Sequence, residues 1–232
     1  MRLVDISMPI DERYQMHTPT GVKDVQFKIE VIKDYDAPGG AGQIVRAIQA
    51  RLHTGTHIDA PAHFVKGGKL VSDFPLTTFV GWAQIADVRH RVPGGGITAD
   101  DLERGVGARW QAGDRLLLRS GWNRHYGEPS YDAESPYLML DGLDWIIRHR
   151  PSLVGHDFSH SKDAPNAPTK YHTVRALLQA GIPCMDYLVN LDVIEQDKVF
   201  LVALPWAVQG TEAAPTRAIV IEGLGPETGF GR

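Results

Sequence analysis

The stretch HTGTHIDAPAH, residues 53–63, constrains the local fold strongly because it is unsuited to a helix. His53 and His57 have the i, i+4 spacing by which two histidines on one helix share a zinc ion. However, β-branched residues flank them, Gly55 lies between them and Pro61 follows closely, and all of these disfavour a helix. The zinc-protease pattern also needs a glutamate directly after the first histidine, where this chain has Thr54. We therefore predict an extended segment.

In an extended segment, alternate residues face the same side of the chain. His57 and Asp59 would lie about 6.6 Å apart at Cα, so their side chains can converge. His53 and His57 would lie about 13 Å apart, too far to share an ion with bonds of about 2.0–2.1 Å. A turn at Gly55 removes this obstacle, because glycine tolerates backbone conformations that other residues avoid. The stretch thus predicts that His53 folds back to join His57 and Asp59 as metal ligands.

The composition is that of an ordinary globular protein, with 43% hydrophobic and 22% charged residues. A chain of 232 residues is expected to form a single domain, residues 1–232. The formal net charge of -4 gives no electrostatic reason to expect nucleic acid or a membrane as a partner. Cys184 stands alone, which excludes an intrachain disulfide and a thiolate cluster. Without a signal-peptide pattern or an apolar run of about 18 residues, a cytoplasmic location is expected.

Short apolar runs predict a fold rich in sheet. In VQFKIEV, residues 25–31, apolar and polar residues alternate strictly, as in a half-buried strand. Further strands are predicted over residues 42–52, 82–88, 114–121, 152–157, 183–189, 198–204 and 217–223.

Three segments predict helices. Thr98 is suited to cap a helix that begins with acidic residues and runs to residue 106. Residues 141–150 have apolar residues at helical spacing and end before a proline. Residues 171–181 have an apolar face and end at Gly181, a favourable C-terminal residue. The fold class expected is therefore α/β, one mixed domain with a sheet-rich core and about three helices.

HTGTHIDAPAH also resembles the pattern H-x-G-T-H-x-D-x-P-x-H of the cyclase-type metal-dependent hydrolases, a family that includes bacterial kynurenine formamidase and isatin hydrolase. The resemblance extends from LVDISMPI near the start to LVALPWAVQGTEAAPTRAIVIE near the end. It implies a swivelling β/β/α fold with peripheral helices. It also implies that His53, His57 and Asp59 bind a metal ion and that His63 is the catalytic proton carrier.

The resemblance implies a second ligand set within KYHTVRALLQAGIPCMDYLVNL. His172, at the head of a predicted helix, matches the histidine of that set. Asp186 occupies the position where formamidases have a glutamate, so its side chain is one methylene shorter. From the residues alone, His172 is equally well explained as a surface residue at a helix N-terminus.

The substrate pocket is expected to differ from that of the formamidases. They commonly carry a Trp-Pro-Gly-Asp segment near the N-terminus, whereas this chain has ERYQMHTPTGVKD. In GHDFSHSKD, His156 and His160 follow a predicted strand and either line the pocket with Asp157 or belong to a hydrogen-bonded loop. The aromatic residues available for a pocket, or otherwise for the core, are Tyr14, Phe27, Phe64, Trp82 and Trp206.

Imidazole and carboxylate ligands suit Zn²⁺, Mn²⁺ or Fe²⁺, and one or two ions of Zn²⁺ or Mn²⁺ per chain are expected. An ion with an open position lowers the pKa of bound water from about 15.7 toward about 7. His63 can take a proton from that water and return it to a leaving nitrogen. The predicted reaction is hydrolysis of an amide bond in a small aromatic or cyclic substrate such as N-formylkynurenine. Ring opening of a lactam, imide or lactone, as in isatin, is the alternative.

Two other classes of protein stay open. His57, Asp59 and His172 would form the 2-His-1-carboxylate set of a non-haem iron oxygenase, although this leaves His53 without a role. A non-catalytic binding protein would have no use for a proton carrier at His63. The resemblance further implies a homo-oligomer, a dimer or tetramer, with a small-molecule substrate bound near the subunit contacts.

Overall fold

The computed structural model describes residues 1–11, 27–39 and 42–225. Predictions for Tyr14 and for the start of the strand at Val25 fall outside these ranges.

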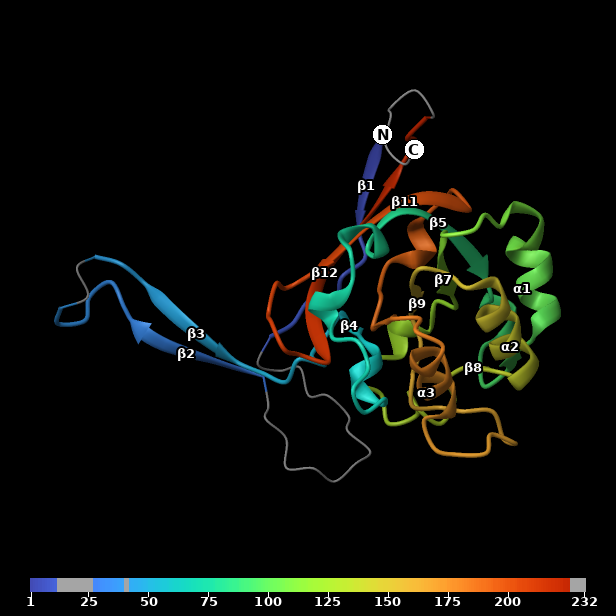
Figure 1. The fold of residues 1–232 in the computed structure, drawn as a ribbon. Helices are drawn as coiled ribbons and strands as arrows, with labels where there is room; N and C mark the ends of the chain where they lie inside the picture. Colours follow the sequence, from blue (N-terminus) through green and yellow to red (C-terminus); the bar gives the residue numbers. More distant parts are fainter. Residues whose placement is uncertain (12–26, 40–41, 226–232) are drawn as a thin grey trace.

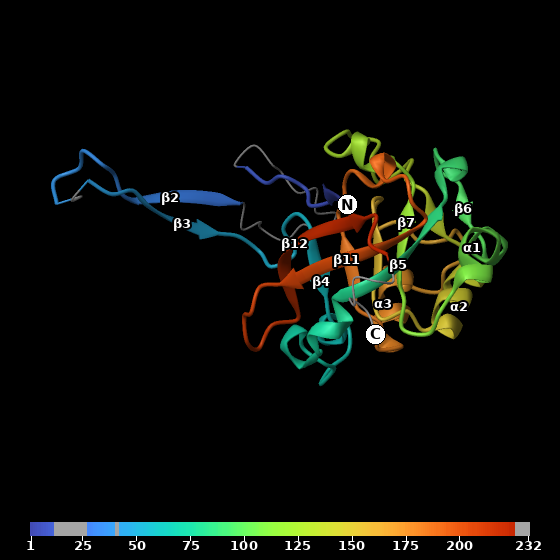
Figure 2. The same ribbon diagram turned by 90° about the horizontal axis from the view of Figure 1, so that it is seen from above.

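A closed sheet of seven strands forms the centre of the molecule (Figures 1 and 2). Hydrogen bonds join its strands in the order β12-β11-β5-β7-β9-β10-β4, and β4 pairs again with β12 to close the barrel. β1 (Arg2–Asp5) pairs with the C-terminal half of β12, on the edge opposite to β11. The barrel strands are β4 (His57–Asp59), β5 (Val80–Asp87), β7 (Arg115–Arg119), β9 (Val154–His156), β10 (Cys184–Asp186), β11 (Lys198–Pro205) and β12 (Ala213–Glu222).

Three helices connect the parallel strands of the barrel. β5, β7, β9 and β10 are parallel neighbours, and the chain passes through one helix between each consecutive pair. These helices are α1 (Ala99–Val106), α2 (Leu140–His149) and α3 (His172–Gln179), and they lie together on one side of the sheet (Figure 1). No helix in the described ranges is both long enough and apolar enough to cross a membrane.

Short elements complete the described chain. β6 (Gly96–Ile97) pairs with β8 (Tyr137–Leu138). Single 3-10 turns are η1 (Pro61–His63), η2 (Val71–Asp73), η3 (Leu76–Thr78), η4 (Arg89–Arg91), η5 (Gly107–Arg109), η6 (Trp122–His125) and η7 (Leu191–Val193).

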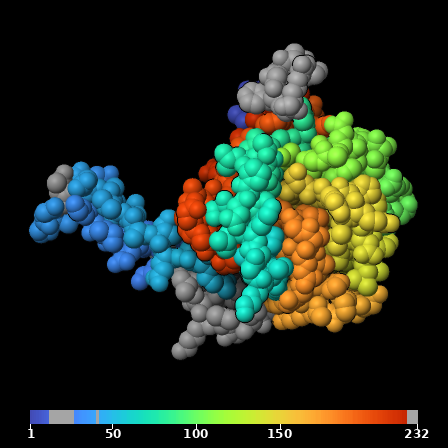
Figure 3. All heavy atoms as spheres, viewed as in Figure 1, coloured from blue at the N-terminus to red at the C-terminus, as the bar shows by residue number. Residues whose placement is uncertain are grey.

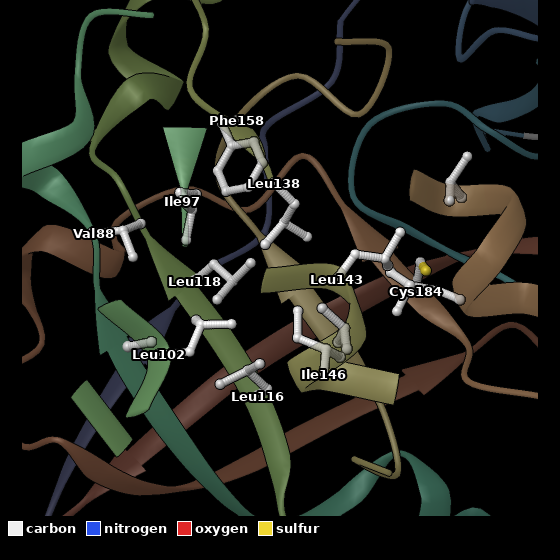
Figure 4. Packing of buried hydrophobic residues seen from close by; sticks show 14 of the residues in the cluster. Val88, Ile97, Leu102, Leu116, Leu118, Leu138, Leu143, Ile146, Phe158 and Cys184 are labelled. Carbon is white, nitrogen blue, oxygen red and sulfur yellow. The ribbon is translucent and has the colours of Figure 1, made fainter. Parts of the chain in front are cut away.

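The alternation of side chains along the strands produces two apolar cores. On β7, Leu117 packs with residues from the other barrel strands, whereas Leu116 and Leu118 pack toward the helices. Figure 4 shows the second core, where Leu102 of α1 and Ile146 of α2 meet the outer face of the sheet. All five of these side chains are buried, so both faces of the parallel strands are apolar, as expected for strands covered by helices.

The structure confirms the mixed α/β class and the three predicted helices. Thr98 caps α1, because its hydroxyl oxygen accepts a hydrogen bond from the backbone N–H of Asp101. Strands are present in all of the segments predicted to be extended. β1, β6 and β8 were not predicted.

One prediction about burial was wrong. β2 (Lys28–Lys33) was expected to be a half-buried strand, but every residue in it is exposed. β2 pairs with β3 (Val45–Gln49) in a separate two-stranded sheet, and this hairpin projects away from the body (Figures 1 and 3). The alternation gave β2 an apolar face, but within the single chain nothing in the barrel covers it.

Candidate active site

The HTGTHIDAPAH motif brings its first two histidines and its aspartate together. His57 and Asp59 lie on β4 and are both buried. The predicted turn at Gly55 is confirmed, since its φ angle is 60° and lies in the left-handed region. His53 therefore folds back, and its Nδ1 atom lies 2.8 Å from Asp59 Oδ1. His57 Nε2 lies 3.2 Å from the same oxygen atom.

Hydrogen bonds orient both imidazole rings. His57 Nδ1 lies 2.8 Å from the carbonyl oxygen of Gly55. Because a carbonyl oxygen can only accept, Nδ1 donates to it, and Nε2 is the ring nitrogen that faces Asp59. His53 Nε2 lies 3.2 Å from Glu212 Oε1, which leaves Nδ1 facing Asp59. Metal-ligating histidines are commonly held in this way by a carbonyl or carboxylate on the other ring nitrogen.

The three residues fit a divalent metal ion. One donor atom from each of His53, His57 and Asp59 lies within 4.8 Å of the others. Asp59 Oδ1 is buried, and its short contacts with the two histidines do not have hydrogen-bond geometry. A buried carboxylate oxygen of this kind needs a cation or a donor, and an ion between the three groups would supply it.

The electrostatics favour a positive charge at the same place. Burial opposes a charge on His53, but the nearby carboxylates of Asp59 and Glu212 outweigh it and raise the pKa of His53 to about 9. Burial likewise opposes a charge on Asp59, but His57 and His53 hold the pKa of that carboxyl well below its usual range. The site is therefore built to stabilise an anionic carboxylate beside a cation.

His63 lies beside this cluster with weaker contacts. It ends η1, and its Nε2 atom lies 4.0 Å from Asp59 Oδ2, while its ring centroid is 4.3 Å from that of His53. Its side chain is 31% exposed, whereas that of Asp59 is 3% exposed. Burial lowers the pKa of His63, so its imidazole is neutral near pH 7 and can accept a proton.

Glu212 is a site residue that the sequence reasoning missed. β12 pairs with β4 so that Ala213 lies opposite Asp59, and the preceding Glu212 thereby comes next to His53. Glu212, His53 and His63 form a second set of donor atoms within 4.8 Å of one another. The sequence held a clue to this role, because Glu212 lies in the C-terminal stretch GTEAAPT, which is part of the resemblance to the family.

Asp186 reaches the site from the neighbouring strand. The register of β10 with β4 places it opposite His57, and its Oδ2 atom lies 3.9 Å from His57 Nε2. His156 Nε2 lies 2.9 Å from Asp186 Oδ1, and His160 Nδ1 lies 3.4 Å from Oδ2. His156 and His160 thus face the site. Asp157 does not, because it accepts hydrogen bonds from Ser120 and Gly121.

His172 begins α3, as predicted. Its backbone N–H donates to Asp163 Oδ2 at 3.0 Å, and its side chain is half-buried. Within the described ranges, the two sets of donors close enough to share an ion include neither His172 nor Asp186. Their assignment to a second metal ion stays a prediction.

Aromatic side chains cover one side of the cluster. The Phe64 ring lies 4.4 Å from that of His63 and 6.2 Å from that of Tyr171. The sequence reasoning missed Tyr187, whose ring centroid lies 5.8 Å from that of His57. By contrast, Trp82 packs against Phe200, and Trp206 is 54% exposed. Of the four proposed aromatic residues that lie within the described ranges, Phe64 is the one that the structure places in contact with the motif.

Comparisons with known proteins show which proteins this chain resembles in sequence and in fold. The model of the Cyclase family matches residues 4–163. A kynurenine formamidase of Bacillus cytotoxicus is 28% identical over 94% of this chain and 96% of its own length. Isatin hydrolase A from Ralstonia solanacearum superposes with a TM-score of 0.82 at 26% identity, covering 94% of this chain and 91% of that one. A potential metal-dependent hydrolase with cyclase activity superposes with a TM-score of 0.71 at 26% identity, covering 94% and 96%.

Proposed function

This chain belongs to the Cyclase family, and we propose from that premise that it is a metal-dependent hydrolase that cleaves a C–N amide bond in a small aromatic or cyclic substrate. The observation that carries the proposal is the convergence of His53, His57 and Asp59, with the neutral and half-exposed imidazole of His63 beside them. Relatives named as formamidases and isatin hydrolases support the same class of reaction.

His53, His57 and Asp59 would hold the ion, which we propose to be Zn²⁺ or Mn²⁺. These ions suit ligands of mixed imidazole and carboxylate type. When bound, such an ion acts as a Lewis acid that activates water near neutral pH and polarises a substrate carbonyl group. Gly55 and Glu212 keep the ring nitrogens of the two histidines turned toward Asp59.

His63 would move the proton. Its Nε2 atom is close to the cluster but not part of the tightest set of donors, and the ring is open to a substrate. It would accept a proton as water attacks the carbonyl carbon and would return it to the leaving nitrogen, so that the C–N bond breaks without a covalent enzyme intermediate. Phe64 and Tyr171 are placed to contact an aromatic substrate on this side.

The substrate is the finer part of the proposal. We rank N-formylkynurenine first and a ring-opening reaction of an isatin-like lactam, imide or lactone second. Sequence relatives favour the former and the structural superposition favours the latter. Both compounds are aromatic, so Phe64 and Tyr171 are compatible with either.

The decisive experiment is an absorbance assay of the purified protein with N-formylkynurenine, isatin, simple lactones and imides. Metal would be removed with a chelator, and Zn²⁺ or Mn²⁺ would be restored. Activity that depends on the ion, and that is lost in Asp59→Ala, is expected. Turnover of isatin but not of the formamide would reverse the ranking of substrates. Failure to hydrolyse any carbonyl–nitrogen or carbonyl–oxygen bond would contradict the proposal.

The same assay separates the rival classes. Anaerobic turnover with Zn²⁺ or Mn²⁺ would exclude an iron oxygenase, since these ions do not supply its oxygen chemistry. Any metal-dependent turnover would exclude a purely binding role.

We further propose that the protein is a cytoplasmic homo-oligomer, with no nucleic acid or membrane as a partner, and that its fold is of the swivelling β/β/α class. The hairpin β2–β3 supports the oligomer. It exposes the apolar side chains of Val31, Ile32 and Ile48, and an isolated two-stranded hairpin is only marginally stable in water. A second copy of the chain would bury this surface. The closed barrel with helices on one side is consistent with the fold class.

A further inference from the structure

The guanidinium group of Arg175 lies against the aromatic side of the candidate site. Arg175 is on α3, which packs against η1, the turn that ends at His63. Its Cζ atom lies over the Phe64 ring, 4.6 Å from the ring centroid, and the Phe64 ring lies 4.4 Å from that of His63. Phe64 therefore connects this cation to the proposed proton carrier.

The guanidinium has no anionic partner in the part of the chain that the structure describes. Arg175 is half-buried, its Nε atom is buried without a hydrogen-bond acceptor, and its side chain forms no ion pair with a described carboxylate. Asp163, which precedes the same helix, instead accepts hydrogen bonds from the backbone N–H groups of His172 and Thr173. A half-buried cation is costly without a counter-charge, so this position favours an anion that the chain itself does not supply.

The contact with Phe64 leaves the donors of Arg175 available to a ligand. A guanidinium group has five N–H donors in one plane, and this fork fits the two oxygens of a carboxylate. A second cation lies on the same side of the site, because Nζ of the exposed Lys170 is 5.0 Å from the centroid of the Tyr171 ring. The rings of Phe64 and Tyr171 lie 6.2 Å apart, so each of these two neighbouring rings has a cation beside it.

We propose that Arg175 binds a carboxylate group of the substrate and that the site thereby selects anionic aromatic amides over neutral ones. The inference rests on the proposed function and narrows its substrate class. The amide carbonyl group would face the proposed metal ligands and His63, the aromatic ring would lie along Phe64, and the carboxylate would reach Arg175. Of the two ranked substrates, N-formylkynurenine carries a carboxylate at a distance from its formamide group, whereas isatin carries none.

The first test compares an aromatic acid with its uncharged amide. The two probes are 3-benzoylpropionate, whose carboxylate is separated from the ring by a carbonyl and two methylene groups, and 3-benzoylpropionamide. Calorimetry would measure the binding of each to the full-length protein loaded with zinc. We expect the wild type to bind the acid roughly 10–100-fold more tightly, as is typical of one charge-assisted pair of hydrogen bonds.

Two variants assign that preference to a residue. Arg175→Met keeps a side chain of similar length over Phe64 but removes the charge, and it should abolish the preference for the acid. Arg148→Met is the matched control and should keep it, because Arg148 is exposed on α2 and its Nε atom donates to the carbonyl oxygen of Asp144 in the same helix. No preference in the wild type would overturn the inference. A preference that survives in Arg175→Met would also overturn it, since the carboxylate would then bind elsewhere, such as at the metal ion.

Kinetics separate substrate recognition from simple packing against Phe64. With N-formylkynurenine, Arg175→Met should raise KM roughly 10–100-fold and change kcat little, because the lost contact is remote from the bond that breaks. A lower kcat with an unchanged KM would show that Arg175 only supports the position of Phe64 or His63, and would overturn the inference. A wild type that binds the acid through Arg175 but hydrolyses none of the compounds would contradict the proposed function and leave Arg175 as a carboxylate-binding residue.

Discussion

His53 and His63 lie side by side, but their surroundings give them different properties. His53 contacts two carboxylates, and these raise its pKa to about 9 against the effect of burial. For His63, burial is the largest influence, and it lowers the pKa. The surroundings of His53 thus favour a positive charge, whereas those of His63 favour a neutral ring that can accept a proton.

Replacing His63 should separate catalysis from metal binding. His63→Ala is expected to keep the ion and to lose roughly 10²–10⁴-fold in rate, since it would remove the proposed proton carrier but none of the three residues proposed as ligands. The rate and the metal content would be measured on the same sample. Loss of the ion in His63→Ala would instead make His63 a ligand, as the second donor set with Glu212 allows.

Metal binding should depend on pH in a defined direction. Without the ion, His53 is protonated below about pH 9, and the ion must displace that proton in order to bind Nδ1. Affinity should therefore rise by up to about tenfold per pH unit between about pH 6 and 8. Calorimetry in two buffers of different ionisation enthalpy would measure the protons released. Binding with no proton release would contradict this assignment of His53.

The turn before β4 decides whether the motif can converge. A Cβ atom on Gly55 would lie 2.5 Å from Cδ1 of Ile10, and the φ angle of 60° is itself unfavourable for other residues. Gly55→Ala should cost about 1–2 kcal/mol of stability and should also weaken metal binding. Gly67→Ala is the matched control, because Gly67 has a φ angle of 75° and a Cβ atom there would meet no atom within 4 Å. Equal metal affinity in both variants would show that the turn does not position His53.

The first turn of α1 should contribute to stability at neutral pH. The Asp101 side chain accepts hydrogen bonds from Thr98 and Arg91, and these overcome burial to lower the pKa of Asp101. The stabilisation is therefore present above the ordinary pKa of about 3.9 and is lost as the pH falls through the folded-state value.

Asp101→Asn should lower the free energy of unfolding by about 1–3 kcal/mol at pH 7 and should make it less sensitive to pH below about 5. The neighbouring Asp100, which is 75% exposed at the side chain, provides Asp100→Asn as the control. Urea unfolding at several pH values would measure both variants. A similar loss in the two variants would contradict a special role for Asp101.

The exposed apolar residues of the hairpin β2–β3 allow the proposed oligomer to be tested. If a second copy covers its apolar face, the wild type should be a dimer or a larger oligomer by light scattering. Val31→Asp combined with Ile48→Asp should shift it toward the monomer, whereas Glu30→Lys on the same hairpin, also exposed, should not. A wild-type protein that is monomeric at all accessible concentrations would contradict the proposed oligomer.

Local sequence determined much of this protein. The turn at Gly55, the ligand order in HTGTHIDAPAH, the cap at Thr98 and the three helices follow from backbone preferences and from spacings of a few residues, which are properties of short segments. The alternation of apolar residues likewise identified β2 as a strand, but it could not show that the strand leaves the body.

Tertiary structure alone decided which distant groups meet. The closed barrel brings Glu212 beside His53 through the pairing of β12 with β4, and Asp186 beside His57 through the pairing of β10 with β4. His156 and His160 face Asp186 because β9 and β10 are parallel neighbours. These contacts depend on strand order and register, which are set by the packing of the whole apolar core and not by any short segment. The sequence therefore indicated the candidate ligands and several of their neighbours, but neither Glu212 nor which of these side chains meet.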